Sequence, residues 1–239
     1  MTRKRIAIYL LYCIVGVGVG MLGGCQQPAQ WQTLFDGSDT DAWRGFKQDS
    51  FPDTGWLVED DALVFDPDTG RSGDIITREK YGNFELELEF KLTEAANSGI
   101  KYFILEELAR GRNPLGPEYQ ILDDERHPDA DQGREGTRQL ASLYDVLAAR
   151  ADKPVRPIGQ WNSARLISRD GRIEHWLNGA KVLEYRRDDP KLLEFIEMSK
   201  FKDNDSFIHA ITQLDEGHIA LQDHADKVYY RNIRIRRLD

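Results

Sequence analysis

The chain has 239 residues, of which 40% are hydrophobic and 31% charged, with Gly 20 and Pro 9. This balance excludes disordered, collagen-like and multi-span membrane proteins, and it indicates a globular fold. The 41 acidic residues outnumber the 32 basic ones and give a net charge of −9. Because nucleic-acid binding needs a basic surface, we expect no nucleic-acid partner.

The first 24 residues have the pattern of a secretory signal peptide. A basic segment at residues 3–5 precedes an uncharged run over residues 6–24 that is interrupted by glycines. The run ends in Leu22-Gly23-Gly24-Cys25, which resembles a bacterial lipobox. We therefore expect cleavage after Gly24, lipidation of Cys25 and a flexible tether over residues 25–30. A true membrane span is the alternative.

Cleavage would remove three basic residues, lower the net charge from −9 to −12 and discard Cys13. With Cys25 used as the anchor, the folded part has no thiol for a disulfide, a zinc–thiolate site or a cysteine nucleophile. We expect a lipoprotein of the cell envelope that contacts the membrane through its lipid anchor only. By the sorting convention of Gram-negative cells, Gln26 favours the outer membrane, with the protein facing the periplasm.

Residues 31–239 are expected to form one domain, since no Pro/Gly/Ser-rich linker divides them. The clearest strand is residues 83–92, where apolar residues alternate with Glu85, Glu87, Glu89 and Lys91. Glutamates opposite a continuous apolar face are typical of a solvated outer surface, so we exclude them from the functional site. The next alternating segment, residues 118–122, places Glu118 and Gln120 on one face.

The dipeptides Asp170-Gly171 and Asn178-Gly179 predict two hairpin turns, and hence three antiparallel strands between residues 161 and 185. Two-residue loops would pair Arg169 with Arg172 and Leu177 with Ala180. One face then carries Trp161, Arg165, Ile167, Glu174, Trp176 and Leu183. The other carries Ala164, Leu166, Ile173, His175, Leu177 and Val182, and is expected to face the core. Aromatic rings beside charged groups suit a polyhydroxylated ligand, while an amphipathic sheet half-covered by loops fits the pattern equally well.

One helix is expected, over residues 190–201, with Asp189 as its N-cap and Pro190 in its first turn. In residues 218–224 the alternation points Ile219 and Leu221 inward and Gln222 and His224 outward. A last strand covers residues 228–238. Many short strands with one short helix predict an all-β fold, a sandwich of two antiparallel sheets.

Standard catalytic and metal motifs are missing from the sequence. There is no Gly-x-Ser-x-Gly, no phosphate-binding glycine loop and no His-Glu-x-x-His. The Glu-x-Asp-x-x-Glu motif of laminarinase-type glycosidases is also absent, which disfavours an ordinary two-carboxylate endoglucanase and leaves it as an alternative. We assign no metal ligands and expect no cofactor, with a divalent metal left open. Residues 123–131 lack EF-hand spacing, which favours a solvated turn over a calcium loop.

A series of short segments carries the most specific information. In chain order they are Leu34-Phe35-Asp36-Gly37, Asn83-Phe84-Glu85-Leu86, Asn97-Ser98-Gly99-Ile100-Lys101-Tyr102-Phe103, Gly116-Pro117-Glu118-Tyr119-Gln120-Ile121-Leu122-Asp123, Leu143-Tyr144-Asp145, Trp161-Asn162, His175-Trp176-Leu177-Asn178-Gly179, Leu221-Gln222-Asp223-His224 and Arg231-Asn232-Ile233. Together, from about Trp31 to Leu238, they closely resemble the 3-keto-disaccharide hydrolase domain family, long known as a domain of unknown function.

The resemblance implies a concanavalin-like jelly-roll sandwich with a concave sugar-binding face. It also implies cleavage of glycosides whose glucosyl ring is oxidised at C3, which releases 3-keto-glucose. A ketone at C3 acidifies the hydrogen on C2, so a base can remove it and the C1 substituent can leave, after which water adds to the enone. The expected partners are the oxidised carbohydrate and a separate nicotinamide or flavin oxidoreductase that makes it.

The same resemblance makes Glu118, His175 and His224 the candidate catalytic residues, since a buried carboxyl group and neutral imidazoles can transfer protons near neutral pH. The candidate substrate-binding residues are Lys101, Gln120, Asp123, His127, Trp161, Arg165, Trp176 and Gln222. A hydrogen-bonded core histidine is an equal alternative for His175.

Two further points stay open at the level of the sequence. The family usually has Gly where this chain has Ala225, and if that residue needs a positive φ, the local turn must differ. A non-catalytic lectin on the same sandwich, with Trp161 and Trp176 as its sugar-stacking platform, is the alternative function from a different class.

Overall fold

The computed structural model describes residues 29–109 and 111–239. The predicted signal peptide, Cys25 and residues 26–28 of the predicted tether lie outside the described residues. Among the helices within the described ranges, none is both long enough and apolar enough to cross a membrane.

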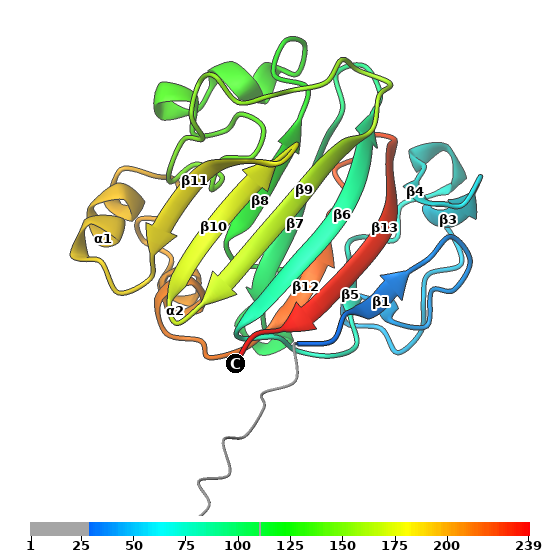
Figure 1. The fold of residues 1–239 in the computed structure, drawn as a ribbon, viewed down its shortest axis with the longest axis horizontal. Coiled ribbons are helices and arrows are strands. Elements are labelled where there is room, and N and C mark those ends of the chain that lie inside the picture. The colour runs from blue at the N-terminus through cyan, green and yellow to red at the C-terminus, as the bar shows by residue number, and fades with distance from the viewer. Residues whose placement is uncertain (1–28, 110) are drawn as a thin grey trace, which may run out of the picture.

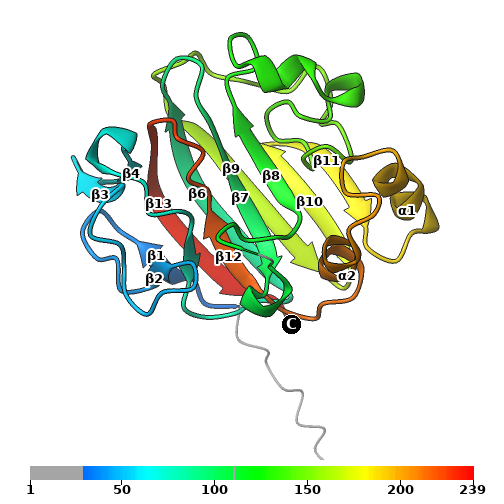
Figure 2. The same cartoon turned by 180° about the vertical axis from the view of Figure 1, so that it is seen from behind.

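Two antiparallel sheets, which we call the larger and the smaller sheet, lie face to face (Figures 1 and 2). The larger sheet contains β1 (Gln32–Phe35), β3 (Trp56–Glu59), β4 (Ala62–Phe65), β6 (Phe84–Leu92), β9 (Asn162–Arg169), β10 (Arg172–Leu177), β11 (Ala180–Arg186) and β13 (Val228–Arg237). The smaller sheet contains β2 (Trp43–Gly45), β5 (Ile75–Thr77), β7 (Asn97–Ile104), β8 (Glu118–Leu122) and β12 (His218–Leu221).

The strand order is β11-β10-β9-β6-β13-β4-β3 in the larger sheet, with β1 paired to β13, and β2-β5-β12-β7-β8 in the smaller one. Non-consecutive neighbours such as β6 and β13 mean that the chain crosses repeatedly between the sheets, as in a jelly roll. The predicted all-β sandwich of two antiparallel sheets is confirmed.

Strand β6 shows why the sheets stack. Its apolar residues Leu86, Leu88 and Phe90 are buried between the sheets, while its glutamates face outward. On the outer face Glu87 pairs with Arg234 of β13 at 2.6 Å and Glu89 with Arg231 at 2.8 Å. The glutamates therefore lie on the outer surface, as predicted, but they are ion-paired and Glu85 is buried rather than solvated.

The meander of β9, β10 and β11 has the predicted register at both turns, with Arg169 opposite Arg172 and Leu177 opposite Ala180. A β-bulge, however, interrupts the β10–β11 pairing between His175 and Trp176. The bulge inserts one extra residue into β11 and reverses the alternation beyond it. Leu183, predicted to face outward, is consequently buried; that prediction is wrong.

The predicted helix is α1 (Pro190–Glu197), which ends earlier than expected. Its N-cap Asp189 accepts a hydrogen bond from the backbone N–H of Lys191, as predicted. A second helix, α2 (Asp205–Thr212), was not predicted; Asn204 caps it and Phe207 anchors it in the core. Figure 2 shows α2 beside the smaller sheet, where it contacts β7. Short 3-10 helices lie at Pro67–Thr69, Glu106–Leu108, Pro128–Asp131 and Arg134–Gly136.

Candidate active site

The outward face of the smaller sheet carries a group of polar side chains. Lys101 on β7 lies directly opposite Glu118 on β8, and Gly99 lies opposite Gln120. The backbone N–H of Gln222, just after β12, donates to the carbonyl of Gly99 at 3.0 Å. Directly paired residues share a face of a sheet, so these side chains point the same way, away from the core.

These side chains and the surrounding loops form a cleft of about 200 Å³, a space on the scale of one sugar ring. The predicted site residues that line it are Lys101, Glu118, Gln120, Gln222 and His224. The structure therefore brings together Glu118 and Gln120, which were predicted to share a face, and Gln222 and His224, which were predicted to point outward.

Glu118 is the buried carboxyl group at the floor of the cleft. Burial raises the pKa of Glu118 to about 7, although the positive charge of Lys101 acts in the opposite direction. Gln120, with its amide nitrogen turned toward Glu118, donates to Glu118 Oε1 at 3.1 Å. The carboxylate occupies space that only a glycine leaves free, since a Cβ on Gly99 would lie 2.2 Å from that same oxygen.

Lys101 forms a buried ion pair beside Glu118, with its Nζ 2.8 Å from Asp74 Oδ2. Burial alone would lower the pKa of Lys101, but the charges of Asp74 and Glu118 outweigh it, so the pKa is raised and the ammonium group stays charged. The other carboxylate oxygen of Asp74 accepts from the backbone N–H of Asp223 at 3.1 Å. Asp74 thus ties Lys101 to the turn that carries His224.

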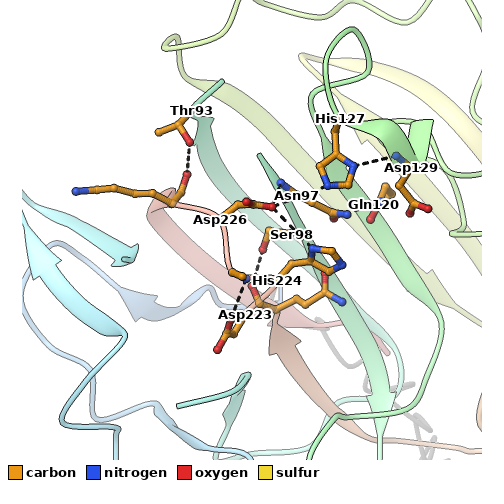
Figure 3. Close-up of polar contacts among 12 residues, drawn as sticks. Thr93, Asn97, Ser98, Gln120, His127, Asp129, Asp223, His224 and Asp226 are labelled. Carbon is orange, nitrogen blue, oxygen red and sulfur yellow. Dashed lines mark hydrogen bonds and ion pairs between the residues drawn. The ribbon is translucent and has the colours of Figure 1, made fainter. Parts of the chain in front are cut away.

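At the mouth of the cleft, His224 presents a half-exposed ring close to His127 and Asp226 (Figure 3). Burial lowers the pKa of His224, an effect that the charge of Asp226 only partly offsets. The imidazole is therefore neutral at pH 7. Ala225 has a φ of 75°. Alanine thus adopts the positive φ itself, at a cost of about 1–2 kcal/mol, so the replacement of the family's glycine does not prevent this conformation.

Two more groups present polar atoms to the cleft. The side-chain Oε1 of Gln222 is buried and has no hydrogen-bond partner within the described residues, so it is free to accept from a ligand hydroxyl. On the loop side, Lys200 Nζ lies 4.1 Å from the ring centre of Tyr144, and the Tyr144 hydroxyl donates to Asp129 at 2.8 Å.

His175 does not join this cleft. It is fully buried between the sheets, where its Nδ1 lies 2.9 Å from the carbonyl of Ala141 and its Nε2 lies 3.0 Å from the hydroxyl of Tyr102. Burial lowers the pKa of His175 to about 4. Both ring nitrogens are engaged by core groups, so the structure contradicts a catalytic role for His175. His175 is instead the hydrogen-bonded core histidine that was its equal alternative.

Trp161, Arg165 and Trp176 also lie elsewhere, on the outer face of the larger sheet. Arg165 and Trp176 line a groove of about 690 Å³ there, and the guanidinium of Arg165 lies 4.1 Å from the centre of the Trp176 ring. Arg231 covers the Trp161 ring at the same distance. These three residues therefore do not share the cleft of Glu118 and His224, because the sandwich core separates the two faces.

Asp123 and His127 belong to the loop after β8. Asp123 is buried, and its carboxylate accepts from the backbone N–H groups of Ala95 at 2.9 Å and Glu125 at 3.2 Å. These contacts shape the loop, and Asp123 does not line the cleft. His127 is largely buried and faces Asp226.

Five residues near the cleft were missed: Asp74, Asn97, Tyr144, Lys200 and Asp226. Asn97 and Tyr144 lie in segments that carry the family resemblance, and Asp226 follows His224 at the spacing of an alternating pattern, so each had a detectable signal. Asp74 and Lys200 had none, because nothing in the local sequence indicates that they approach Lys101 or Tyr144.

The family model of the 3-keto-alpha-glucoside-1,2-lyase-like domain matches residues 30–236. The chain belongs to this family. A relative from Bacteroides thetaiotaomicron named 3-keto-disaccharide hydrolase is 36% identical over 229 residues, which cover 87% of this chain and 78% of the relative. The predicted resemblance is therefore confirmed.

Two crystal structures of candidate glycosyl hydrolases from Parabacteroides distasonis have the same fold. The first is 29% identical with a TM-score of 0.74 and matches 87% of this chain and 94% of that one. The second is 27% identical with a TM-score of 0.62 and matches 87% of this chain and 100% of that one.

Proposed function

We propose that this protein cleaves glycosides whose glucosyl ring carries a ketone at C3, by elimination followed by hydration. The family and the name of the Bacteroides relative support glycoside cleavage. The observation that carries the mechanism is the placement of two proton-transfer groups in one small cleft: Glu118, buried beside the cation Lys101, and His224 at the mouth.

Each step uses a group already present in the cleft. His224, as the neutral base, removes the proton from C2, and the electron pair of that bond forms an enolate with the C3 ketone. The enolate collapses to an enone and expels the oxygen on C1, which takes its proton from the neutral carboxyl group of Glu118. Water then adds at C1 and gives up a proton to the Glu118 carboxylate, while C2 regains a proton from protonated His224, which yields 3-keto-glucose and restores both groups.

The roles follow from the two environments. Burial holds Glu118 as a proton donor up to about pH 7 and keeps His224 uncharged, so an acid and a base coexist near neutrality. Lys101 supplies the positive charge that stabilises the developing enolate. No hydride or electron is transferred, so these steps need no redox cofactor, and a separate nicotinamide or flavin oxidoreductase must supply the ketone.

We also propose that the protein acts in the cell envelope, held by lipid on Cys25. The support is the lipobox-like Leu22-Gly23-Gly24-Cys25 after an apolar run. Lipid labelling of the expressed full chain, compared with a Cys25→Ser variant, tests this: labelled lipid on the wild type only is expected, and label on neither protein would contradict the anchor.

The experiment that tests the activity compares 3-keto-trehalose with trehalose. We expect release of 3-keto-glucose from the oxidised sugar only, and a loss of kcat of about 10²–10⁴-fold in Glu118→Gln. Glu87→Gln, on the outer face of the larger sheet, is the matched control and should retain activity. Equal hydrolysis of trehalose would indicate an ordinary glycosidase, and binding without cleavage of either sugar would indicate a lectin.

A further inference from the structure

His127, His224 and Asp226 converge at the mouth of the cleft, where His127 comes from the loop after β8 and the other two from the turn between β12 and β13 (Figure 3). One nitrogen or oxygen of each lies within 4.8 Å of those of the others. Such a group can bind a metal ion or can form a chain of hydrogen bonds. The hydrogen bonds around it distinguish the two arrangements.

The tautomer of His127 is the first deciding feature. Its Nδ1 accepts a hydrogen bond from the backbone N–H of Asp129 at 3.1 Å. A backbone N–H can only donate, so Nδ1 carries a lone pair and the proton of the neutral ring is on Nε2. That nitrogen faces Asp226 Oδ2 at 4.0 Å. A metal would need a lone pair on Nε2, so the arrangement favours an N–H group that faces Asp226, at a distance beyond a direct hydrogen bond, over a metal ligand.

The surroundings of Asp226 are the second feature. Its Oδ2 accepts from the backbone N–H of Asn97 at 3.0 Å, which fixes the carboxylate against the start of β7. The same oxygen lies 3.8 Å from Nδ1 of His224. An ionised carboxylate only accepts hydrogen bonds, so it stabilises the tautomer of His224 that carries its proton on Nδ1. Within residues 29–109 and 111–239, no group hydrogen-bonds Nε2 of His224.

We infer that Asp226 is a positioning residue that holds the proton of His224 on Nδ1 and leaves Nε2 free to accept the C2 proton, with His127 and the Asn97 N–H holding the carboxylate in place. When His224 accepts that proton, its positive charge develops beside Asp226, which stabilises it. The catalytic consequence rests on the proposed function, whereas the tautomer does not.

Nitrogen-15 NMR of the histidine side chains tests the tautomer in the wild-type protein without substrate. His224→Gln identifies the His224 signals, and His209→Gln on the exposed face of α2 is the control substitution. We expect the neutral His224 ring to carry its proton on Nδ1 and His127 to carry its proton on Nε2. A His224 ring protonated on Nε2 would overturn the inference whether or not the protein cleaves any sugar.

Asp226→Asn tests the consequence for catalysis on 3-keto-trehalose. We expect kcat to fall by about 10²-fold or more. The acid limb of kcat/KM should also move to lower pH, because the negative charge that raises the pKa of His224 is gone. The groups that face His224 and set this limb are Asp226, His127, Asp129 and Lys101. Asp53→Asn, at an exposed loop residue, should change neither quantity.

Three results separate the possible failures. A fall in kcat without a shift of the acid limb would mean that Asp226 is merely structural, and would overturn the inference. Binding of Zn²⁺ by metal-free wild type, lost in Asp226→Asn, would also overturn it, because it requires a lone pair on His127 Nε2. Absence of turnover on every 3-keto-glycoside, with the expected tautomer observed, would overturn the proposed function and leave the pairing of Asp226 with His224 intact.

Discussion

Glu118 shows how two opposing effects set the chemistry of a single residue. The register of β7 and β8 places the cation Lys101 directly opposite it, and an opposite charge normally lowers the pKa of a carboxyl group. Asp74, however, already neutralises much of that charge at 2.8 Å. Burial therefore prevails, and Glu118 keeps its proton to a higher pH than an exposed glutamate would.

This pKa predicts a pH-dependent stability. Glu118 binds its proton more tightly in the folded state, where its pKa is about 7, than in the unfolded chain, where its pKa has the ordinary value of 4.5. Its contribution to the free energy of unfolding is therefore present below pH 4.5 and is lost as the pH rises through 7. At ~1.4 kcal/mol per pKa unit, the loss between pH 5 and pH 8 is about 2–3 kcal/mol. Lys101, Asp74, Lys200 and Asp129 are the charged groups that act on it.

Urea unfolding of the wild type and Glu118→Gln at pH 5 and pH 8 measures this contribution. The Gln variant has no carboxyl group to titrate, so we expect its stability relative to the wild type to rise by about 2–3 kcal/mol between the two pH values. Glu87→Gln should show no comparable change. A difference between wild type and Glu118→Gln that stays constant with pH would contradict the raised pKa.

At the scale of the elements, alternation in the sequence was enough to group four of the residues that line the cleft. It placed Glu118 and Gln120 together, and Gln222 with His224, because successive side chains of a strand point to opposite faces. It failed at Leu183, since a bulge changes the period by one residue and leaves no mark in the pattern. Helix α2, which is as short as α1, was missed because it has no proline in its first turn to mark its start, as Pro190 does in α1.

The close approach of β7 to Glu118 leads to a prediction at this same scale. The strand can lie this near to the Glu118 carboxylate only because residue 99 is a glycine and has no side chain. A Cβ there would lie 2.2 Å from Glu118 Oε1, so Gly99→Ala must displace the carboxylate. We expect a fold that persists, as measured by circular dichroism, and at least a tenfold loss of kcat on 3-keto-trehalose, on the order of what a misplaced proton-transfer group costs.

The matched control is Gly45→Ala on β2 of the same sheet, where the new Cβ would meet the flexible side chain of Gln48 at 2.7 Å. That side chain lies outside the cleft and can move away, so activity should be retained. Full activity of Gly99→Ala would mean that the position of the Glu118 carboxylate does not limit the reaction.

At the scale of the whole molecule, the sandwich has two outer faces, and the sequence does not say which strands share one. Alternation distinguishes inward from outward residues but not the outside of one sheet from the outside of the other. This is why Trp176 and Arg165 were grouped with Glu118, although the larger sheet carries the first two and the smaller sheet the third. The pairing of strands that are distant in the sequence, such as β12 with β7, determines which outward side chains share a face.

The separation of the two faces predicts that Trp176→Ala leaves catalysis nearly unchanged. Trp176 packs against Arg165 on the far side of the core from the cleft, so we expect kcat and KM on 3-keto-trehalose to stay within about twofold of the wild type, a change well under 1 kcal/mol. His224→Ala, measured in parallel, should abolish turnover. A large rise in KM for Trp176→Ala would instead support a sugar-binding role for the outer groove.

The fate of the hydrogen on C2 tests the elimination most directly. A 3-keto-glucoside labelled with deuterium at C2 is cleaved in ordinary water, and the deuterium left in the 3-keto-glucose is measured by mass spectrometry at early times, with unreacted substrate and enzyme-free product as controls for spontaneous exchange. Elimination predicts loss of the label beyond the exchange seen in the controls, because the half-exposed His224 can exchange the deuteron with water before a proton returns to C2. Product that keeps its C2 deuterium would show direct displacement at C1 and contradict the mechanism.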